Sequence, residues 1–388
     1  MQGRCLQLQA VGNTKRLALR GRSIDKRRDR GLERMKMNFA SDNGAGVAPQ
    51  ILEAIAASSR VNAPAYGADE FSTRAEARLS EVFERPVKAF LVATGTGANA
   101  LALAALVRPW EAIFCHEEAH VHDDECGAPE FFSSGAKLIG IPGLAGKITL
   151  EGLRETLARY PRGLVKASQP GALSLSQATE AGTLYTVAEV AALAEIAHAA
   201  KMPVHMDGAR FANAIVALGV APADLTWRAG IDVLSFGATK NGALACEAVI
   251  FFDPAKAEAF AYQRKRGGHT LSKGRFLGAQ MLAYLEGGLW LELAAKANAA
   301  AQKLSRALAA APGVRKTWPT EANEAFLVAP TAVAEGWMRA GAKFHAWPTR
   351  ALAANLAPCE SETLYRFVTS FETTDAEIAA FAALAQNQ

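Results

Sequence analysis

IDVLSFGATKNGA, residues 231–243, joins a short apolar run to a turn of small residues that presents one lysine, Lys240. The run is rich in branched side chains and has the length of a buried β-strand. An unpaired ammonium group in such a place is costly, and desolvation would lower its pKa. Lys240 could then act as an amine nucleophile toward a carbonyl, or it could be a surface lysine just after a strand.

Strand and helix patterns alternate on both sides of this stretch. Strands separated by helices of roughly ten to fifteen residues predict βαβ units and an α/β fold with a mostly parallel sheet. Ligands of such sheets bind at the carboxyl ends of the strands. A long alanine-rich helical stretch is expected over residues 278–310, before a final group of strand and helix patterns. The expected strands of the sheet are residues 87–93, 112–115, 137–142, 172–176, 203–206, 233–236 and 248–252.

The size and composition of the chain predict one large and one smaller domain. It has 388 residues, half of them hydrophobic, which exceeds a typical single domain. We expect a basic, disordered tail over residues 1–36, a large α/β domain with an N-terminal arm over 37–285, and a small α+β domain over 286–388. No apolar run approaches the roughly 20 residues needed to span a bilayer, so no membrane partner is expected.

Charge and cysteine usage exclude several classes of protein. Residues 1–36 hold eleven Lys or Arg against three acidic residues, a net charge of +8, whereas the remaining 31 basic and 35 acidic residues give −4. The mildly acidic globular part argues against nucleic acid as a partner. Five cysteines without CxxC spacing are typical of reduced thiols in a cytoplasmic protein and not of disulfides or zinc.

A glycine-bearing turn, residues 93–99 (ATGTGAN), connects an expected strand to an expected helix. The amides of the first helical turn, together with the helix dipole, form an anion site that suits phosphate. The motif matches neither the Walker pattern nor GxGxxG, so a plain connection is the alternative.

Histidines follow the strand that ends at Cys115. His120 and His122, with His116 nearby, could suggest a metal, but no further cluster supplies the remaining ligands, and we expect no metal site. A flat imidazole that stacks on a ring is the other interpretation for His120, and a partly exposed loop residue is the alternative for His116 and for His122.

A carboxylate, Asp207, stands at the end of another expected strand, and Arg210 follows three residues later. The two could form a structural ion pair. Alternatively, Asp207 could keep a heterocyclic nitrogen protonated, as the ring of pyridoxal 5′-phosphate requires. A phosphate turn, a stacking histidine, this carboxylate and a Schiff-base lysine together make the set that pyridoxal phosphate needs.

Several motifs at matching spacing extend this pattern from about residue 38 to residue 380. The sequence resembles the fold-type-I pyridoxal-phosphate enzymes of the threonine aldolase and β-eliminating lyase group, close to the low-specificity L-threonine aldolases and phenylserine aldolases. The segments that carry the resemblance are residues 39–43, 66–69, 94–96, 119–120, 176–180, 205–214, 235–242 and 366–369.

The resemblance implies how the cofactor is held. Lys240 would carry pyridoxal phosphate as a Schiff base, Asp207 would pair with the ring nitrogen, and His120 would stack on the ring. Gly95 and Thr96 would hold the phosphate.

Further positions are implied around the cofactor and the substrate. Ser41, Arg210 and Arg366 would bind the substrate carboxylate, and Arg210 would also approach the ring hydroxyl. Tyr66 would line the site across a dimer interface, and Arg275 would reach the phosphate from a neighbouring subunit. Gln177 would face the edge of the cofactor.

The implied reaction is that of an aldehyde-lyase: cleavage of L-threonine, L-allo-threonine or an aryl β-hydroxy amino acid such as phenylserine to glycine and an aldehyde. A homodimer or homotetramer with shared active sites is expected. Another β-eliminating lyase or transaminase-like reaction on the same scaffold is the alternative, and a binding protein on an inactive scaffold is a third.

The catalytic base is the point where the sequence departs from part of this group. Some members carry a second histidine ahead of the Gln177 region, but no histidine occurs between His122 and His198. The base is therefore assigned to His120, or to a water that it holds, with His122 as the second candidate.

Overall fold

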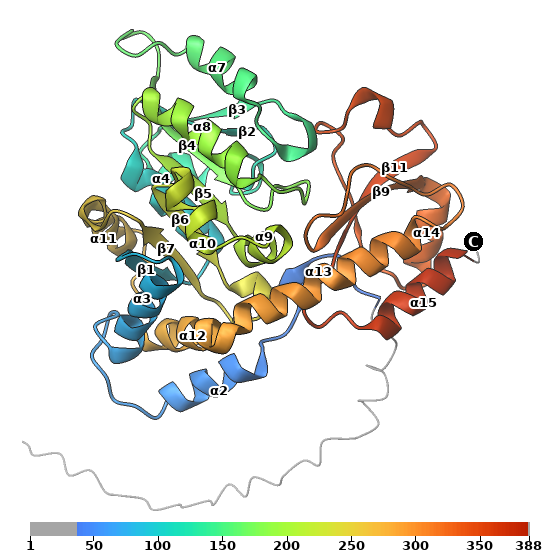
Figure 1. Cartoon of the computed structure of the whole chain (residues 1–388), viewed down its shortest axis with the longest axis horizontal. Coiled ribbons are helices and arrows are strands. Elements are labelled where there is room, and N and C mark those ends of the chain that lie inside the picture. Colours follow the sequence, from blue (N-terminus) through green and yellow to red (C-terminus); the bar gives the residue numbers. More distant parts are fainter. Residues whose placement is uncertain (1–36, 387–388) are drawn as a thin grey trace, which may run out of the picture. The chain divides into compact units, whose positions relative to one another are not determined.

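The computed structural model describes residues 37–386, which form two β-sheets and the helices packed on them (Figure 1). The predicted tail, residues 1–36, lies outside the described residues. The larger sheet contains β1 (Lys88–Val92), β2 (Glu111–His116), β3 (Lys137–Ile141), β4 (Gln169–Ser176), β5 (Val204–Gly208), β6 (Val233–Gly237) and β7 (Glu247–Phe251). Their order across the sheet is β1-β7-β6-β5-β4-β2-β3.

Six of these seven strands run in one direction. Strand β7 is antiparallel to both of its neighbours, β6 and β1, whereas the other neighbouring pairs are parallel. Asp207 of β5 lies opposite Ser176 of β4 on one side and Ser235 of β6 on the other. The carboxyl ends of these three strands therefore lie together at one edge, and the predicted mostly parallel sheet is confirmed.

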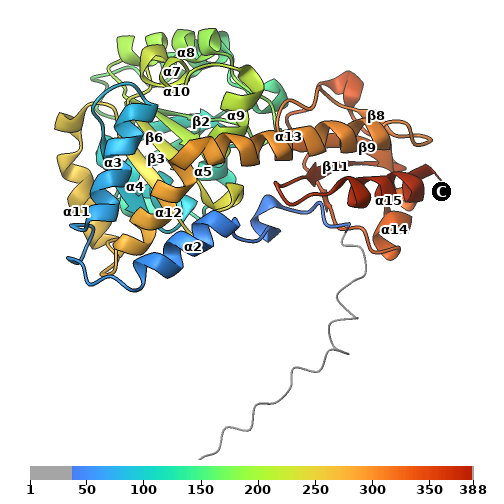
Figure 2. The same ribbon diagram turned by 60° about the horizontal axis from the view of Figure 1, so that its bottom comes forward.

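Helices cover both faces of this sheet (Figure 2). Leu234 and Phe236 of β6 pack in one hydrophobic cluster and Val233 packs in another, because successive side chains of a strand point to opposite faces. The Leu234 face is covered by α2 (Pro49–Ser58), α3 (Glu70–Val82), α7 (Leu150–Ala158), α8 (Val187–Ala199), α9 (Phe211–Leu218), α10 (Pro222–Leu225) and α12 (Arg275–Leu285). The other face is covered by α4 (Gly95–Leu106), α5 (His120–Asp123), α6 (Ala128–Phe132) and α11 (Glu258–Arg266).

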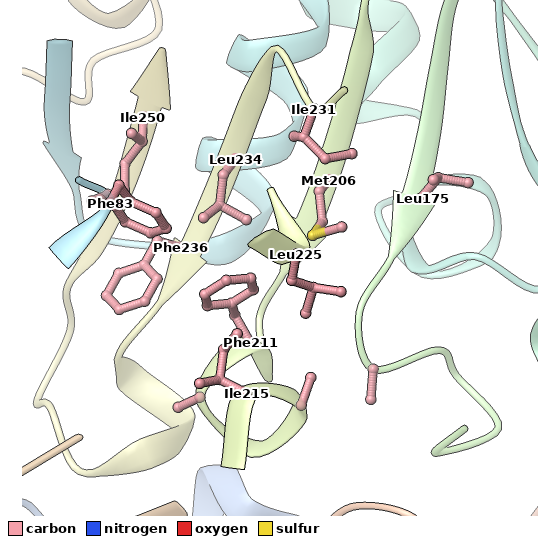
Figure 3. Packing of buried hydrophobic residues seen from close by; sticks show 14 of the residues in the cluster. Phe83, Leu175, Met206, Phe211, Ile215, Leu225, Ile231, Leu234, Phe236 and Ile250 are labelled. Atoms are coloured by element: carbon pink, nitrogen blue, oxygen red, sulfur yellow. The ribbon is translucent and has the colours of Figure 1, made fainter. Parts of the chain in front are cut away.

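Aromatic packing fixes β6, the strand that precedes Lys240. The ring of Phe236 has its centroid 5.9 Å from that of Phe211, 6.1 Å from Phe83 and 5.5 Å from Trp290. Figure 3 shows Phe83, Phe211 and Phe236 close together beneath the sheet. Burial of rings at this density leaves β6 little freedom to move, so the turn after it, η4 (Thr239–Asn241), starts from a defined place.

The helical stretch expected over residues 278–310 is interrupted in the structure. Two helices lie there, α12 and α13 (Leu289–Leu308), separated by a turn. Gly287 and Gly288 in that turn have φ of +58° and +78°, values that glycine adopts without steric cost. The alanine-rich pattern continues on both sides of the two glycines and so conceals the break.

The second sheet forms the smaller α+β part. It is antiparallel, and its core contains Trp337, Phe344 and Phe367. Phe39 from the N-terminal arm stacks on Phe381 in the same core at 5.4 Å between ring centroids. The elements, given in chain order, are β8 (Arg315–Lys316), β9 (Glu324–Pro330), α14 (Thr331–Arg339), β10 (His345–Ala346), β11 (Glu362–Val368) and α15 (Asp375–Gln386).

The boundary predicted between residues 285 and 286 stays a prediction. The helix that follows it, α13, contributes Leu293 to the core of the large sheet and Leu304 to the core of the small one. Within residues 37–386, no helix has both the length and the apolar composition needed to cross a membrane.

Candidate active site

A cavity of about 270 Å³ lies at the carboxyl ends of the central strands β4, β5 and β6. This is the edge at which open α/β sheets bind their ligands. Six predicted site residues meet there: Gly95, Thr96, His120, Asp207, Arg210 and Lys240. The other lining residues are Asn43, Ala93, Thr94, Asn99, Ala178, Glu180, Ala209, Thr239 and Glu247.

The turn between β1 and α4 presents backbone amides to the cavity. Thr94 caps α4, since its hydroxyl oxygen accepts a hydrogen bond from the amide of Gly97 at 3.0 Å. The first amides of a helix have no partner within the helix, and they lie at the positive end of its dipole. A Cβ added to Gly95 would meet no heavy atom within 4 Å, so there is open space in front of this turn. The turn of Gly95 and Thr96 therefore suits an anion such as phosphate.

Asp207 is the second-to-last residue of β5 and is almost completely buried. Its Oδ1 accepts a hydrogen bond from the amide of Ala209 at 3.0 Å, and its Oδ2 accepts one from Nδ2 of Asn99 at 2.8 Å. Because these donors fix the plane of the carboxylate, Asp207 presents a defined negative charge to the cavity.

His120 is paired with a carboxylate that the sequence analysis missed. Nδ1 of His120 lies 2.9 Å from Oε1 of Glu125, and the same oxygen accepts a hydrogen bond from Asn99 at 3.0 Å. The hydrogen bond to Glu125 raises the pKa of His120 to about 9, although burial acts in the opposite direction. A protonated imidazole cannot accept a proton from a substrate, so this geometry argues against His120 as the base.

Lys240 lies in the turn after β6, half-buried on the wall of the cavity. Its ammonium group makes no hydrogen bond and no ion pair within residues 37–386. The nearby carboxyl of Glu247 accepts a hydrogen bond from the amide of Ala238 at 2.9 Å. Burial raises the pKa of Glu247 to about 7, and the charge of Lys240 partly opposes that rise. The amine of Lys240 is thus available to a ligand.

Arg210 is buried and held by two carboxylates. Its Nε and Nη2 donate to the two oxygens of Asp42 at 2.8 and 3.0 Å, and its Nη1 lies 3.3 Å from Oε2 of Glu324. Burial alone would raise the pKa of Asp42, but Arg210 holds it below its usual value. Asp42 also accepts a hydrogen bond from Asn323 at 3.0 Å. Much of the binding capacity of Arg210 is therefore already used within the protein.

Arg366, on β11, has a donor to spare. Its Nη1 lies 3.7 Å from Oε1 of Glu324, its guanidinium stands 4.0 Å from the centroid of the Trp347 ring, and its buried Nε has no hydrogen-bond partner. Glu324 thus lies between Arg366 and Arg210. Ser41 stands beside Asp42 and accepts a hydrogen bond from the amide of Asn43 at 3.2 Å. Arg366 and Ser41 are not on the wall of the cavity itself.

Gln177 requires a correction. Its side-chain amide donates to the carbonyl oxygen of Tyr185 at 2.8 Å and accepts from the amide of the same residue at 3.0 Å. The residue is fully buried, so both polar atoms are used to hold the segment after β4 and none faces the cavity.

Tyr66 and Arg275 lie away from this cavity in their own chain. Tyr66 is 56% exposed, and the ammonium of Lys265 lies 4.9 Å from the centroid of its ring. The Nε of Arg275 donates to the carbonyl oxygen of Ser58 at 3.1 Å. Their predicted roles depend on a neighbouring subunit and stay predictions.

The other histidines of this region have structural partners. Nδ1 of His122 lies 3.2 Å from Oδ1 of Asp123, and the residue is not on the cavity wall. Nε2 of His116 lies 3.1 Å from the carbonyl oxygen of Gly143. In the described part of the chain, no group of three or more His, Cys, Asp or Glu residues could hold a metal ion.

Several polar residues of the site were not predicted. Three had a visible signal, since Asp42, Asn99 and Glu180 belong to segments quoted from the sequence, at residues 39–43, 93–99 and 176–180. Others come from positions without a recognisable pattern, among them Glu125, Glu247 and Glu324.

The fold is that of fold-type-I pyridoxal-phosphate enzymes. The structure of Leishmania major threonine aldolase matches with a TM-score of 0.82 and 25% identity, over 90% of this chain and 98% of that chain. The fold is also shared with Oryza sativa TDC, solved with pyridoxal phosphate and tryptamine, at a TM-score of 0.68 and 13% identity, over 98% and 89% of the two chains.

The chain belongs to the β-eliminating lyase family, whose model matches residues 38–330. A low specificity L-threonine aldolase of Pseudomonas sp. (strain NCIMB 10558) is 39% identical over 89% of this chain and 96% of its own length. The low specificity L-threonine aldolase of Pseudomonas aeruginosa is 41% identical over 79% of this chain and 88% of its own length. The resemblance inferred from the sequence is confirmed.

Proposed function

We propose that this chain is a pyridoxal-phosphate-dependent aldehyde-lyase that cleaves β-hydroxy amino acids to glycine and an aldehyde. The observation that carries the proposal is one cavity in which the unpaired Lys240 lies with Asp207, His120 and an amide-lined turn. The two relatives named low specificity L-threonine aldolases support L-threonine as a substrate, and L-allo-threonine is the second expected substrate. Aryl β-hydroxy amino acids such as phenylserine are the third expected class.

The residues of the cavity fit pyridoxal phosphate in charge and shape. The amides of Gly95 and Thr96 would bind its phosphate, and Asp207 would keep its ring nitrogen protonated. The flat side chain of His120 would lie on the ring, and the free amine of Lys240 would bind the cofactor covalently. When bound, the cofactor accepts the electron pair that remains on Cα as the Cα–Cβ bond breaks.

The substrate carboxylate would bind to Arg366, with Ser41 beside it. A guanidinium binds a carboxylate through two parallel hydrogen bonds, and the buried Nε of Arg366 has no partner in the protein. Arg210, which donates twice to Asp42, would add positive charge and hold its neighbours in place. Glu324 lies close to both guanidinium groups and limits their movement.

His120 would orient an oxygen atom of the substrate and would not remove its proton. With Glu125 bound to Nδ1, the imidazole is protonated at neutral pH and both ring nitrogens are donors. A donor in the wall of the cavity favours an oxygen that gains negative charge.

We further propose a homodimer or homotetramer in which Tyr66 and Arg275 of one subunit complete the site of the next. The high exposure of Tyr66 within its own chain supports this arrangement. A cytoplasmic location fits the free thiols of the described cysteines, Cys115, Cys126, Cys246 and Cys359.

The test is a product analysis of the holoenzyme with L-threonine, L-allo-threonine and phenylserine. We expect equimolar glycine and aldehyde, and the ratio of rates will rank the three substrates. Formation of a 2-oxo acid and ammonia, without aldehyde, would instead indicate the elimination reaction of another member of the family.

A further inference from the structure

Glu180 is an ionisable residue of the cavity to which none of the roles described above is assigned. It lies four residues beyond the end of β4, on the same wall as His120 and Lys240. Reacting groups collect at the carboxyl ends of the central strands of such sheets, so its place in the fold is that of a group that meets the substrate.

The carboxylate of Glu180 has no partner in the protein. Within residues 37–386 it makes neither a hydrogen bond nor an ion pair. Of the other carboxylates in or beside the cavity, Asp207, Glu125 and Glu247 each accept at least one hydrogen bond from a protein donor, and Glu324 forms ion pairs with Arg210 and Arg366. Glu180 is half-buried and lines the cavity, so its free carboxylate is open to a polar group of a ligand.

Charges of both signs surround Glu180. Burial raises the pKa of its carboxyl above the usual value for glutamate, and the cations of His120 and Lys240 oppose that rise. A carboxylate with a raised pKa binds a proton more strongly than an exposed one, which suits proton removal near neutral pH. The charged groups that face it from the neighbouring elements are His120, Lys240, Arg210, Glu324 and Arg366.

We propose that Glu180 is the general base that takes the proton from the β-hydroxyl oxygen of the substrate, an inference that rests on the aldolase function proposed above. The competing groups are committed elsewhere. His120 is already protonated by its contact with Glu125, and His122 lies off the cavity wall. Lys240 would carry the cofactor.

The step balances in atoms and electrons. The O–H bond breaks as Glu180 takes the proton, and its electron pair forms the second bond of the aldehyde C=O. The Cα–Cβ bond breaks, and its electron pair stays on the carbon that becomes Cα of glycine. That carbon then gains one proton, so the net reaction moves one proton from the hydroxyl oxygen to Cα, and Glu180 ends each turnover unprotonated.

The test compares two holoenzyme reactions in Glu180→Gln, since Gln keeps the shape of the side chain but cannot act as a base. Cleavage of L-threonine needs the β-hydroxyl proton to be removed, whereas exchange of the α-hydrogen of glycine with D₂O does not. We expect kcat for cleavage to fall roughly 10²- to 10⁴-fold, as on loss of a general base. Glycine exchange and the absorption spectrum of the bound cofactor should stay close to wild type.

The pH profile provides a second readout. Because the base must be unprotonated, kcat/KM of the wild type should fall at low pH, at a pKa above the ordinary range of glutamate. This limb should disappear in Glu180→Gln. In Glu180→Ala, added formate should restore part of the cleavage, because it supplies a carboxylate in the vacated space. The control is Glu118→Gln, which changes a glutamate outside the cavity and should cleave normally.

Three results would overturn the inference. Cleavage by Glu180→Gln within threefold of wild type would show that no base was lost. Equal losses of cleavage, glycine exchange and cofactor absorption, without formate rescue of the alanine variant, would make Glu180 a structural residue. A wild type that binds the cofactor and exchanges glycine, yet releases no aldehyde from any β-hydroxy amino acid, would overturn the aldolase function and this inference with it.

Discussion

Replacement of Glu125 by Gln should lower the pKa of His120 while its side chain stays in the same position. The pKa of His120 is raised from 6.5 to about 9, chiefly by the hydrogen bond to Glu125 at 2.9 Å, with the charges of Asp207 and Glu180 acting in the same direction. A difference of this size would correspond to roughly 3 kcal/mol at 1.36 kcal/mol per pKa unit. The imidazole side chain is 33% exposed, so solvent screening should reduce the contribution to about 1–2 kcal/mol.

The sign of the effect is set by the raised pKa of His120. Its contribution to folding is fully present below the unfolded pKa of 6.5 and is lost as the pH rises through about 9. Compared with wild type, Glu125→Gln should therefore lose about 1–2 kcal/mol of unfolding free energy at pH 6.5 and much less at pH 9.5.

Two assays measure this prediction. Urea unfolding of both proteins, with cofactor removed, gives the difference in unfolding free energy at each pH. NMR titration of histidine-labelled protein, with His120→Asn to assign the signal, should show the His120 pKa falling toward 6.5 in the variant. A deficit that is the same at both pH values, together with an unchanged titration, would refute an ion pair between these residues.

Two further variants test the contacts of Arg210 and Arg366. Asp42→Asn removes the negative charge that pairs with buried Arg210 and should cost about 3–5 kcal/mol of unfolding free energy, measured in urea. The exposed control Asp224→Asn should cost less than about 1 kcal/mol. Similar costs for the two variants would contradict the buried ion pair. Arg366→Ala should raise KM for every amino acid substrate at least tenfold, because a charge-assisted contact to the substrate carboxylate is lost. The absorption of the bound cofactor should stay unchanged. An unchanged KM in steady-state assays would remove Arg366 from the site.

Much of the fold could be predicted because the signals are local. Strands such as β6 and β7 are short apolar runs buried on both faces, and their sequence shows this directly. The break between α12 and α13 could not be predicted from the local pattern, because Gly287 and Gly288 interrupt a helix only if the chain must turn there. That requirement comes from tertiary packing.

The residues of the site likewise differ in whether the sequence reveals their roles. Lys240 and His120 follow strands and Asp207 lies at the end of one, so the rule that ligands bind at the carboxyl ends of parallel strands was enough to bring them together. Glu125 and Glu324 acquire their roles only through contacts with His120 and with the arginines, which no spacing reveals.

Gln177 illustrates the opposite error. It lies in a motif shared with the family and beside the cavity, yet its amide is used by the backbone of Tyr185, eight residues further along the chain. A motif identifies the segment that surrounds a site, whereas the direction of each side chain within it depends on local hydrogen bonds.

The most direct test of the central claim is glycine release from L-threonine by the holoenzyme and by Lys240→Ala, measured with the cofactor absorption spectrum. The exposed Lys296→Ala serves as the matched control. We predict equimolar glycine and acetaldehyde from the wild type and the control, and neither product nor the bound-cofactor absorption band from a folded Lys240→Ala. Glycine release by Lys240→Ala at a rate near that of wild type would contradict the assignment of Lys240 and, with it, the proposed mechanism.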